Sequence, residues 1–388
     1  MNLISALLND AIAMALILVL LTHSAIIRAR GGLRHQQILS MLLIIGASIL
    51  LDMGSVLLDG RTFPGARILS LTVNTLLHMS PMLFLLIFCR YVHYRLYADR
   101  TRLRNVSRNL VMLCILAALI LALNLFVPVI FSLDASNHYR GGPAHFLHYL
   151  SMLLTAGVSI FFYVRFHMAG GTVRFFPFWI CILPMVLGIL IQAAFLGTSA
   201  MWCGAAVGMA GLYMGLQNEL SYLDPLTSLY NRNYLRLLLQ LAAKEKSEMG
   251  GIMIDMDGMK LINDQFGHAQ GDRALCDVAD LLRAIRPPDC HAIRLGGDEF
   301  MLLLPRCNTS MLLGMEYRLR ERLADFNRVS TRVYELSLSL GHAVFEPDRE
   351  SADDFLRSVD GQMYEEKKKK HAREAQGGIH GVPQASPP

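Results

Sequence analysis

The chain has 388 residues, of which 53% are hydrophobic and 17% are charged, and its formal net charge is +5. A soluble chain of this size usually carries about 25% charged residues, so part of this one avoids water. The first 220 residues hold 14 arginines, no lysine and six acids, and the remainder holds 22 basic and 25 acidic side chains. These unlike halves exclude one uniform soluble fold, a disordered chain, and a nucleic-acid binder defined by overall basicity.

Long apolar runs recur through the first half. A membrane helix needs about 20 mostly apolar residues to cross roughly 30 Å of hydrocarbon. Seven runs approach this length, at 7–27, 37–58, 68–92, 109–133, 146–166, 176–197 and 199–217. The first run has no preceding Lys or Arg and no evident cleavage site, so it is predicted to be a span and not a signal peptide. We therefore predict an all-α bundle of seven transmembrane helices over residues 1–216.

Arginines near the ends of these runs predict the direction of the bundle, because short cytoplasmic loops are enriched in Lys and Arg. Eleven follow the first, third and fifth runs: Arg28, Arg30, Arg34, Arg90, Arg95, Arg100, Arg102, Arg104, Arg108, Arg165 and Arg174. The opposite loops carry only Arg61, Arg67 and Arg140. With seven spans, the N-terminus is predicted outside and everything after Leu216 in the cytosol.

Three polar side chains fall inside apolar runs, where they are costly in lipid and usually face the bundle interior. Asp52 lies in the second run, and Asn74 and His78 share one face of the third because they are four residues apart. They indicate either a site for an extracellular or intramembrane ligand or proton, or interhelical hydrogen bonds that fix the bundle. The second interpretation is the commoner one, and both stay open.

A soluble domain follows the last run. Residues 217–223 contain no Gly or Pro, so we expect a short helical linker there. Residues 224–371 have ordinary soluble composition and are numerous enough for one domain with its own core. Residues 372–388 are rich in Gly, Pro, Ala and Gln, which is typical of a disordered tail.

Within this domain, the apolar run 251–257 is predicted to be a buried strand that ends in two acids. Two more apolar runs, 292–295 and 300–304, flank a Gly-Gly-Asp-Glu sequence, which predicts a hairpin because a tight turn needs positive φ values. If these strands are neighbours, Asp255 and Asp298 come together, and Mg²⁺ prefers such oxygen ligands together with substrate phosphates. Solvated acids at a hairpin tip are the alternative.

The motif Arg294-Leu295-Gly296-Gly297-Asp298-Glu299-Phe300 resembles the signature of the GGDEF family of diguanylate cyclases. Three more motifs occur in the family's order: DPLTSLYNR at 224–232, DMDGMKLIND at 255–264 continuing to 272, and SLG at 339–341. The resemblance implies an α/β (α+β) nucleotidyl-cyclase-like domain with a central sheet and flanking helices. It also implies condensation of two GTP molecules into cyclic di-GMP with release of two pyrophosphates.

The resemblance assigns a metal and phosphate site. Asp255, the carbonyl of Met256 and Asp298 are expected to hold Mg²⁺ or Mn²⁺ on the triphosphate. Glu299 is expected to help coordinate metal or to activate the 3′-hydroxyl of the GTP ribose. Lys260 is expected to neutralise phosphate charge. Glu299, Asp298 and Lys260 form the expected catalytic set.

GTP binding is implied for further residues. Asn263 and Asp272 are expected to hydrogen-bond guanine, and a carboxylate suits its adjacent N1–H and amino donors, which adenine lacks. The other GTP-binding residues implied are Gly258 and Met259 through backbone amides, Gly296 and Gly297 through close backbone approach, and Lys367 through its charge.

Two segments depart from the family pattern. In the C-terminal phosphate clamp, Lys367 matches, but Lys370 and His371 stand where Gly and Arg are expected. Arg286 and Asp289 resemble the Arg-x-x-Asp of a product-inhibition site, but six residues and not five separate them from the two glycines. Ordinary loop chemistry is the alternative for this pair.

The first half resembles the seven-span sensory modules of bacterial signalling proteins, by span count and orientation. We therefore expect a diguanylate cyclase in the bacterial inner membrane, controlled by a transmembrane sensor, with GTP and the bilayer as partners and no nucleic acid. Because one domain holds one GTP, a homodimer is expected. The alternatives are a catalytically inactive GTP-binding or docking module, and a transporter with a regulatory domain, for which no inverted repeat is evident.

Overall fold

A computed structural model describes residues 3–27, 32–97, 100–171, 175–195, 199–287 and 289–376. The chain divides into two compact units, Met1–Glu219 and Leu220–Pro388. The boundary lies close to the predicted one, three residues beyond 216. Each unit is described by itself.

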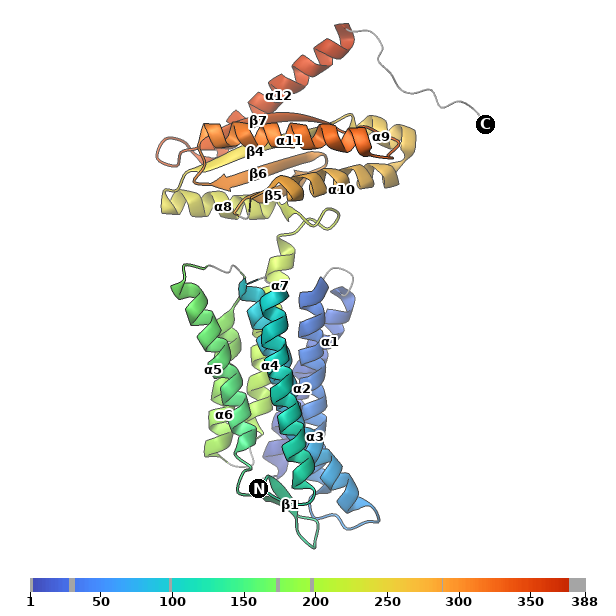
Figure 1. Ribbon diagram of the computed structural model, residues 1–388, viewed down its shortest axis with the longest axis vertical. Helices are drawn as coiled ribbons and strands as arrows, with labels where there is room; N and C mark the ends of the chain where they lie inside the picture. Colours follow the sequence, from blue (N-terminus) through green and yellow to red (C-terminus); the bar gives the residue numbers. More distant parts are fainter. Residues whose placement is uncertain are drawn as a thin grey trace, which may run out of the picture. The chain divides into compact units, whose positions relative to one another are not determined.

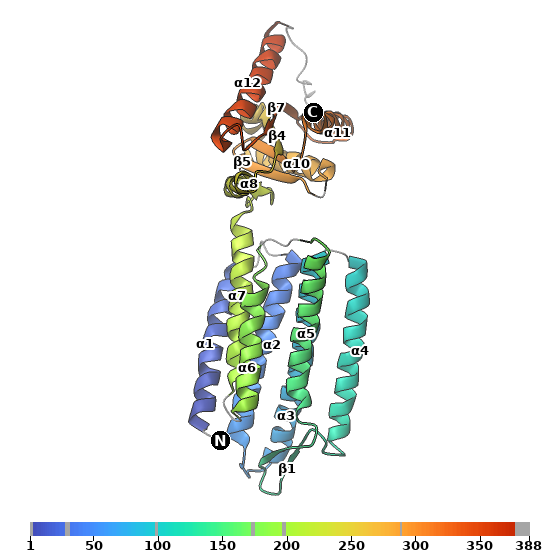
Figure 2. The ribbon, with the colours of Figure 1, turned by 90° about the vertical axis from the view of Figure 1, so that its left-hand side faces the viewer.

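The first unit consists of long helices that run alongside one another (Figure 1, Figure 2). The helices are α1 (Leu3–Ile27), α2 (Gly32–Leu58), α3 (Ala66–Tyr97), α4 (Arg100–Asn124), α5 (Leu147–Met168), α6 (Phe178–Ala194) and α7 (Ala200–Ser221). A two-stranded antiparallel hairpin, β1 (Phe131–Leu133) and β2 (Tyr139–Gly141), lies between α4 and α5 in the chain.

Four stretches in the described part of the chain are long and apolar enough to cross a membrane, namely Ile4–Ser24, His35–Leu58, Ala66–Tyr97 and Ser107–Asn124. Met152–Met168 and Phe178–Ala194 are shorter apolar helices. Apolar side chains cover much of the unit's surface, as expected for helices in lipid. Membrane anchoring is therefore well founded, whereas the count of seven crossings remains a prediction.

The fourth predicted span, 109–133, is wrong at its C-terminal end. Helix α4 stops at Asn124, and residues 131–133 form strand β1. The side-chain oxygen of Asn124 accepts the amides of Ile130 (2.6 Å) and Phe131 (3.3 Å), and its amide donates to the Phe131 carbonyl (3.0 Å). These bonds turn the chain back and favour the hairpin, an effect that an apolar window does not detect.

Helices α6 and α7 pack with their backbones in close approach. A Cβ on Gly204 would lie 2.3 Å from the Pro184 carbonyl oxygen, and one on Gly208 would lie 2.4 Å from the Cys181 carbonyl oxygen. Small residues spaced by four let membrane helices approach in this way. The same composition lowers the hydropathy of α7, which is why its membrane crossing is harder to recognise from apolarity alone.

The second unit is built on a five-stranded sheet with strand order β3-β5-β6-β4-β7. Its strands are β3 (Tyr230–Asn231), β4 (Met249–Asp257), β5 (His291–Gly296), β6 (Glu299–Pro305) and β7 (Ser337–Phe345). Its helices are α8 (Arg232–Glu245), α9 (Met259–Phe266), α10 (His268–Ile285), α11 (Thr309–Val329) and α12 (Ala352–Gln376). The predicted central sheet with flanking helices is confirmed.

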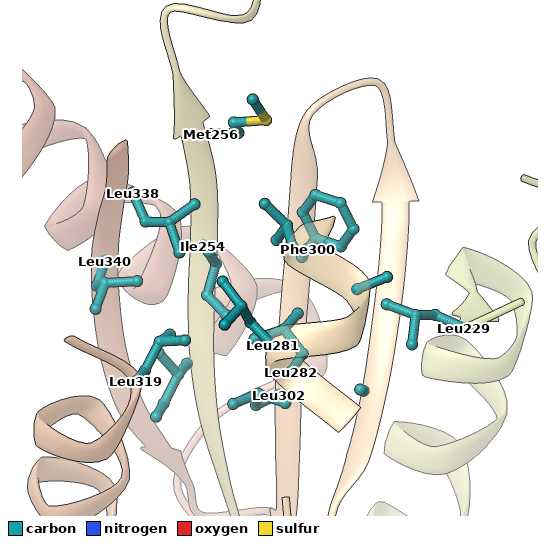
Figure 3. Packing of buried hydrophobic residues seen from close by; sticks show 14 of the residues in the cluster. Leu229, Ile254, Met256, Leu281, Leu282, Phe300, Leu302, Leu319, Leu338 and Leu340 are labelled. Atoms are coloured by element: carbon teal, nitrogen blue, oxygen red, sulfur yellow. The ribbon is translucent and has the colours of Figure 1, made fainter. Parts of the chain in front are cut away.

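The core of this unit lies between the sheet and helices α10 and α11. Figure 3 shows Ile254, Phe300 and Leu340 from three neighbouring strands alongside Leu282 of α10 and Leu319 of α11. Successive strand residues face opposite sides of a sheet. The other face is covered by α12, whose backbone lies so near β7 that a Cβ on Gly341 would be 2.3 Å from the Val359 oxygen. These two faces decide where the strand-end acids point.

Both predicted ends of the domain shift. Helix α7 continues to Ser221, and Leu223 then pairs with Tyr230 in an isolated bridge, so the segment predicted as a linker is partly helix and partly domain. Helix α12 extends to Gln376, so residues 372–376 are helical and the tail predicted from 372 starts too early. Residues 377–388 lie outside the described part.

Candidate active site

The acids at the end of β4 meet the β5–β6 hairpin at one edge of the sheet. Strands β4 and β6 are antiparallel, and their register places Asp255 opposite Glu299. The amide of Met256 donates to the Asp298 carbonyl at 3.0 Å. The predicted neighbours Asp255, Asp298 and Glu299 are thus brought together by backbone pairing alone.

The hairpin turn depends on glycine and on one arginine. Gly296 and Gly297 have φ values of 152° and 53°, and a Cβ at either position would point into open space. Such φ values strain other residues. Arg294 donates to the Gly297 carbonyl from Nη2 (2.7 Å) and to Asp224 Oδ1 from Nη1 (3.0 Å). Arg294 therefore ties the turn to the entry motif, a role the sequence analysis did not assign.

Lys367 of α12 reaches the strand-end acids. Its Nζ lies 2.6 Å from Asp255 Oδ1, because the two-residue period of β4 points Asp255 towards the face that α12 covers. Burial raises the pKa of Asp255 against the opposing effect of Lys367, and Asp298 raises that pKa further. Burial lowers the pKa of Lys367, but the hydrogen bond to Asp255 outweighs burial and leaves it raised.

Glu299 completes a region of repelling carboxylates. Burial is the first cause that raises its pKa, followed by the charges of Asp255, Asp360 and Asp298. Arg232 acts in the opposite direction. Carboxylates that raise one another's pKa are those that a cation between them would relieve.

The donor set has the chemistry of a hard divalent cation site. Asp255, Asp298 and the Met256 carbonyl offer the oxygen ligands that Mg²⁺ prefers, and the ammonium of Lys367 already provides a positive charge on Asp255. Within the described ranges, no group of three or more His, Cys, Asp or Glu side chains is arranged to hold a metal ion. A metal therefore fits as two carboxylates and a carbonyl that are completed by a ligand, with Lys367 displaced from Asp255.

A second group of candidate residues lies on α9 and α10. Gly258, with φ 72°, precedes α9, and Lys260 is exposed in its first turn. A Cβ on Gly271 would lie 2.0 Å from Asn263 Oδ1, so the Asn263 amide packs against the α10 backbone one residue before Asp272. Asp272 is exposed. The two residues expected to contact guanine are thus adjacent, and Met259 lies beside them, with its Cε 2.9 Å from the same Cβ position.

Lys370 has a structural partner that the motif comparison missed. Its Nζ lies 3.0 Å from Asp257 Oδ2, and it also donates to the Leu338 carbonyl. Asp257 accepts hydrogen bonds from Ser337 and Ser339, both at 2.7 Å. The three-residue spacing of Lys367 and Lys370 on α12 matches the two-residue spacing of Asp255 and Asp257 on β4, and that match was the available signal.

Neither the end of the clamp nor the proposed inhibitory pair touches these groups. His371 is exposed on α12. Arg286 and Asp289 are also exposed, and Arg286 Nη1 donates to the Cys290 carbonyl at 3.0 Å. Pro288, between them, lies outside the described residues.

A sheet edge with clustered carboxylates, a mobile lysine and a glycine turn defines a nucleotide-handling α/β domain. Residues 221–373 match the family described as diguanylate cyclase, GGDEF domain. The second unit is therefore a GGDEF domain of the diguanylate cyclase family.

Similar proteins share this segment only. The chain is 32% identical over 155 residues to the probable diguanylate cyclase DgcT of Escherichia coli, covering 38% of this chain and 34% of that protein. It is 33% identical over 155 residues to the diguanylate cyclase DgcP of the same organism, covering 39% of this chain and 46% of that protein. The solved GGDEF domain of DgcB from Caulobacter crescentus, in complex with c-di-GMP, is 27% identical, with 38% and 91% coverage and a TM-score of 0.35. The chain thus spans less than half of these two curated relatives.

Proposed function

We propose that the protein is a membrane-bound diguanylate cyclase that joins two GTP molecules into cyclic di-GMP. The observation that carries this proposal is the convergence of Asp255, Asp298 and Glu299 at one sheet edge in a domain of this family. An inactive docking module has no need of three mutually repelling carboxylates.

The proposed chemistry divides among the chain's own groups. Asp255, Asp298 and the Met256 carbonyl hold Mg²⁺ or Mn²⁺, which neutralises triphosphate charge when bound. Glu299 accepts the proton of the 3′-hydroxyl or aids in holding the metal, and its raised pKa brings it closer to a working general base. Lys260 and Lys367 supply positive charge to phosphate oxygens. Asn263 and Asp272 select guanine.

Two domains are needed for each product molecule, because each holds one GTP and the two hydroxyls attack reciprocally. The proposal therefore includes a homodimer with twofold symmetry at the reacting centre. Arg286 and Asp289 are retained as a possible product site, since both side chains are exposed to solvent.

The first unit is proposed to be a seven-span sensor with its N-terminus outside. The arginine asymmetry supports this direction. Reporter fusions test it: a phosphatase that works only outside the cytosol should be active after Asn137 and inactive after Arg108. Activity in the reverse pattern would refute the orientation.

The test of function is production of cyclic di-GMP from GTP by membranes that carry the full-length protein, with Mg²⁺ or Mn²⁺ present. The expected result is product from wild type and none from Glu299→Ala. GTP binding without product, in a demonstrably dimeric sample, would favour the inactive docking module instead.

A further inference from the structure

The first unit contains a polar cavity of about 270 Å³. Its lining residues come from α1, α2, α3, β2, α5, α6 and α7, together with loop residues, so most of the helices of the unit converge on it. Its polar or aromatic lining includes Asp52, Asn74, His78, Tyr139, Gln192 and Trp202. Ligand pockets typically measure about 300–1,000 Å³, so this one suits a small molecule.

Hydrogen bonds fix one wall of the cavity. Ser55 of α2 donates to Asn74 Oδ1 of α3 at 2.9 Å. His78 Nδ1 donates to the Asn74 carbonyl at 2.8 Å, so Nε2 of the neutral ring is an acceptor, and the Tyr139 hydroxyl lies 3.5 Å from it. This interhelical network accounts for Asn74 and His78 through mutual bonding, which was the commoner of the two sequence interpretations.

Asp52 is not accounted for in the same way. Its printed partner is a neutral hydroxyl, Ser199 Oγ, which donates to Oδ2 at 3.1 Å. Among the described residues that line the cavity there is neither Arg nor Lys. A buried carboxylate without a paired cation is costly in a bundle of apolar helices.

A second buried carboxyl adds to this imbalance. Asp10 of α1 is fully buried, and neither of its oxygens has a hydrogen-bond partner among the described residues. The charges of Asp10 and Asp52 repel each other. Negative charge therefore accumulates beside a cavity whose own lining does not neutralise it.

Aromatic rings surround the same space. Tyr139 and Tyr149 line the cavity with Trp202, whose side chain is 2% exposed. The faces of Trp and Tyr attract cations, with Trp the strongest. We propose that this cavity binds a small organic cation, an alkylated ammonium compound, with its charge on Asp52 and its substituents against these rings.

The same lining argues against a zwitterion. An amino acid or a betaine carries a carboxylate as well as an ammonium group, and the cavity offers no Arg or Lys to receive it. A neutral ligand leaves Asp52 without a counter-charge. This inference goes beyond the proposed cyclase activity, and it can be tested whether or not GTP is turned over.

The chain provides its own optical probe, because it has only two tryptophans. Trp179 is 46% exposed and does not line the cavity. In full-length Trp179→Phe protein in nanodiscs, fluorescence reports Trp202 alone. Choline is titrated against 3,3-dimethylbutan-1-ol, its uncharged isostere, and against glycine betaine, its zwitterionic relative.

Choline is expected to change Trp202 fluorescence with saturation, and both comparison compounds are expected to bind at least about tenfold more weakly, the scale of a desolvated cation–aromatic contact. Asp52→Asn is expected to lose about tenfold in choline affinity, whereas Asp134→Asn, which removes an acid from the hairpin turn outside the cavity, should retain it. Absence of saturable choline binding would overturn the proposal. So would equal binding of choline and its neutral isostere to the unmutated cavity, a result that does not depend on folding of the Asp52 variant.

Discussion

Both units contain buried carboxylates, but only one of them supplies its own cations. At the strand ends of the GGDEF domain, Asp255 is paired with Lys367 and Asp257 with Lys370. In the helical unit, Asp52 has a hydroxyl partner and Asp10 has none among the described residues. Removing one partner of a buried pair is expensive because it leaves an uncompensated charge.

The difference indicates how each site accepts a ligand. A lysine on a flexible stem can move away from Asp255 when a metal with phosphates arrives, so the strand-end site exchanges one cation for another. The cavity beside Asp52 has no such internal substitute, so a cation must come from outside. The first site is therefore expected to tolerate an empty state better than the second.

The largest expected effect follows from removing an acid of the strand-end site. Asp298→Ala should lower cyclic di-GMP production from GTP by at least about a hundredfold, because electrostatic groups aimed at the reacting centre contribute on this scale. Asp325→Ala, which removes an exposed acid of α11, should leave the rate unchanged. Substantial product from the Asp298 variant, measured in membranes with Mg²⁺, would contradict the assigned site.

The sequence was sufficient for features that backbone pattern determines. Strand periodicity and the Gly-Gly turn predicted that Asp255 and Asp298 meet, and Gly296 and Gly297 do occupy left-handed conformations. It was insufficient where long side chains cross between elements, as Lys370 does to Asp257. Such contacts depend on the packing of α12 against β7, which no local pattern encodes.

The cavity shows the same limit. Asp52, Asn74 and His78 were recognised as anomalous in apolar runs, but their different fates follow from partners on other helices. Ser55 satisfies Asn74, whereas Asp52 meets only Ser199. Asp10 was overlooked as an intramembrane acid because it lies near the start of its run, and only the fold shows that it is buried.

The two lysine pairs of α12 can be separated by stability. Lys370→Met should destabilise the domain by about 1–3 kcal/mol, because Asp257 and the Leu338 carbonyl lose a partner in a half-buried setting. Lys368→Met is the matched control, since Lys368 is exposed and rests on the Tyr364 ring. Pulse proteolysis of the full-length protein measures the fraction of the domain unfolded. Equal loss in both variants would contradict a structural role specific to Lys370.

The proposed guanine pair tests whether the GGDEF site is as preformed as the cavity wall. Gly271→Ala places a Cβ 2.0 Å from Asn263 Oδ1, which forces the amide to move. We expect the KM for GTP to rise about tenfold, the cost of roughly one lost hydrogen bond. Gly314→Ala on α11, where a Cβ meets nothing within 4 Å, should leave the KM unchanged. An unchanged KM in Gly271→Ala would remove Asn263 from the guanine site.

The smallest effect concerns the cost of keeping Glu299 charged. Burial and neighbouring acids raise its pKa, so the folded state holds a proton more tightly than the unfolded state. The stabilisation from this proton is fully present below the ordinary pKa of 4.5 and is lost as pH rises through the higher folded value. At pH 7 the ionised carboxylate therefore destabilises the domain. Glu299→Gln should increase stability at pH 7 by less than about 1 kcal/mol, because the group is partly solvated. The gain should vanish towards pH 4, while turnover is lost at every pH. A stability gain that persists in acid would indicate that the variant acts through packing and not through relief of carboxylate repulsion.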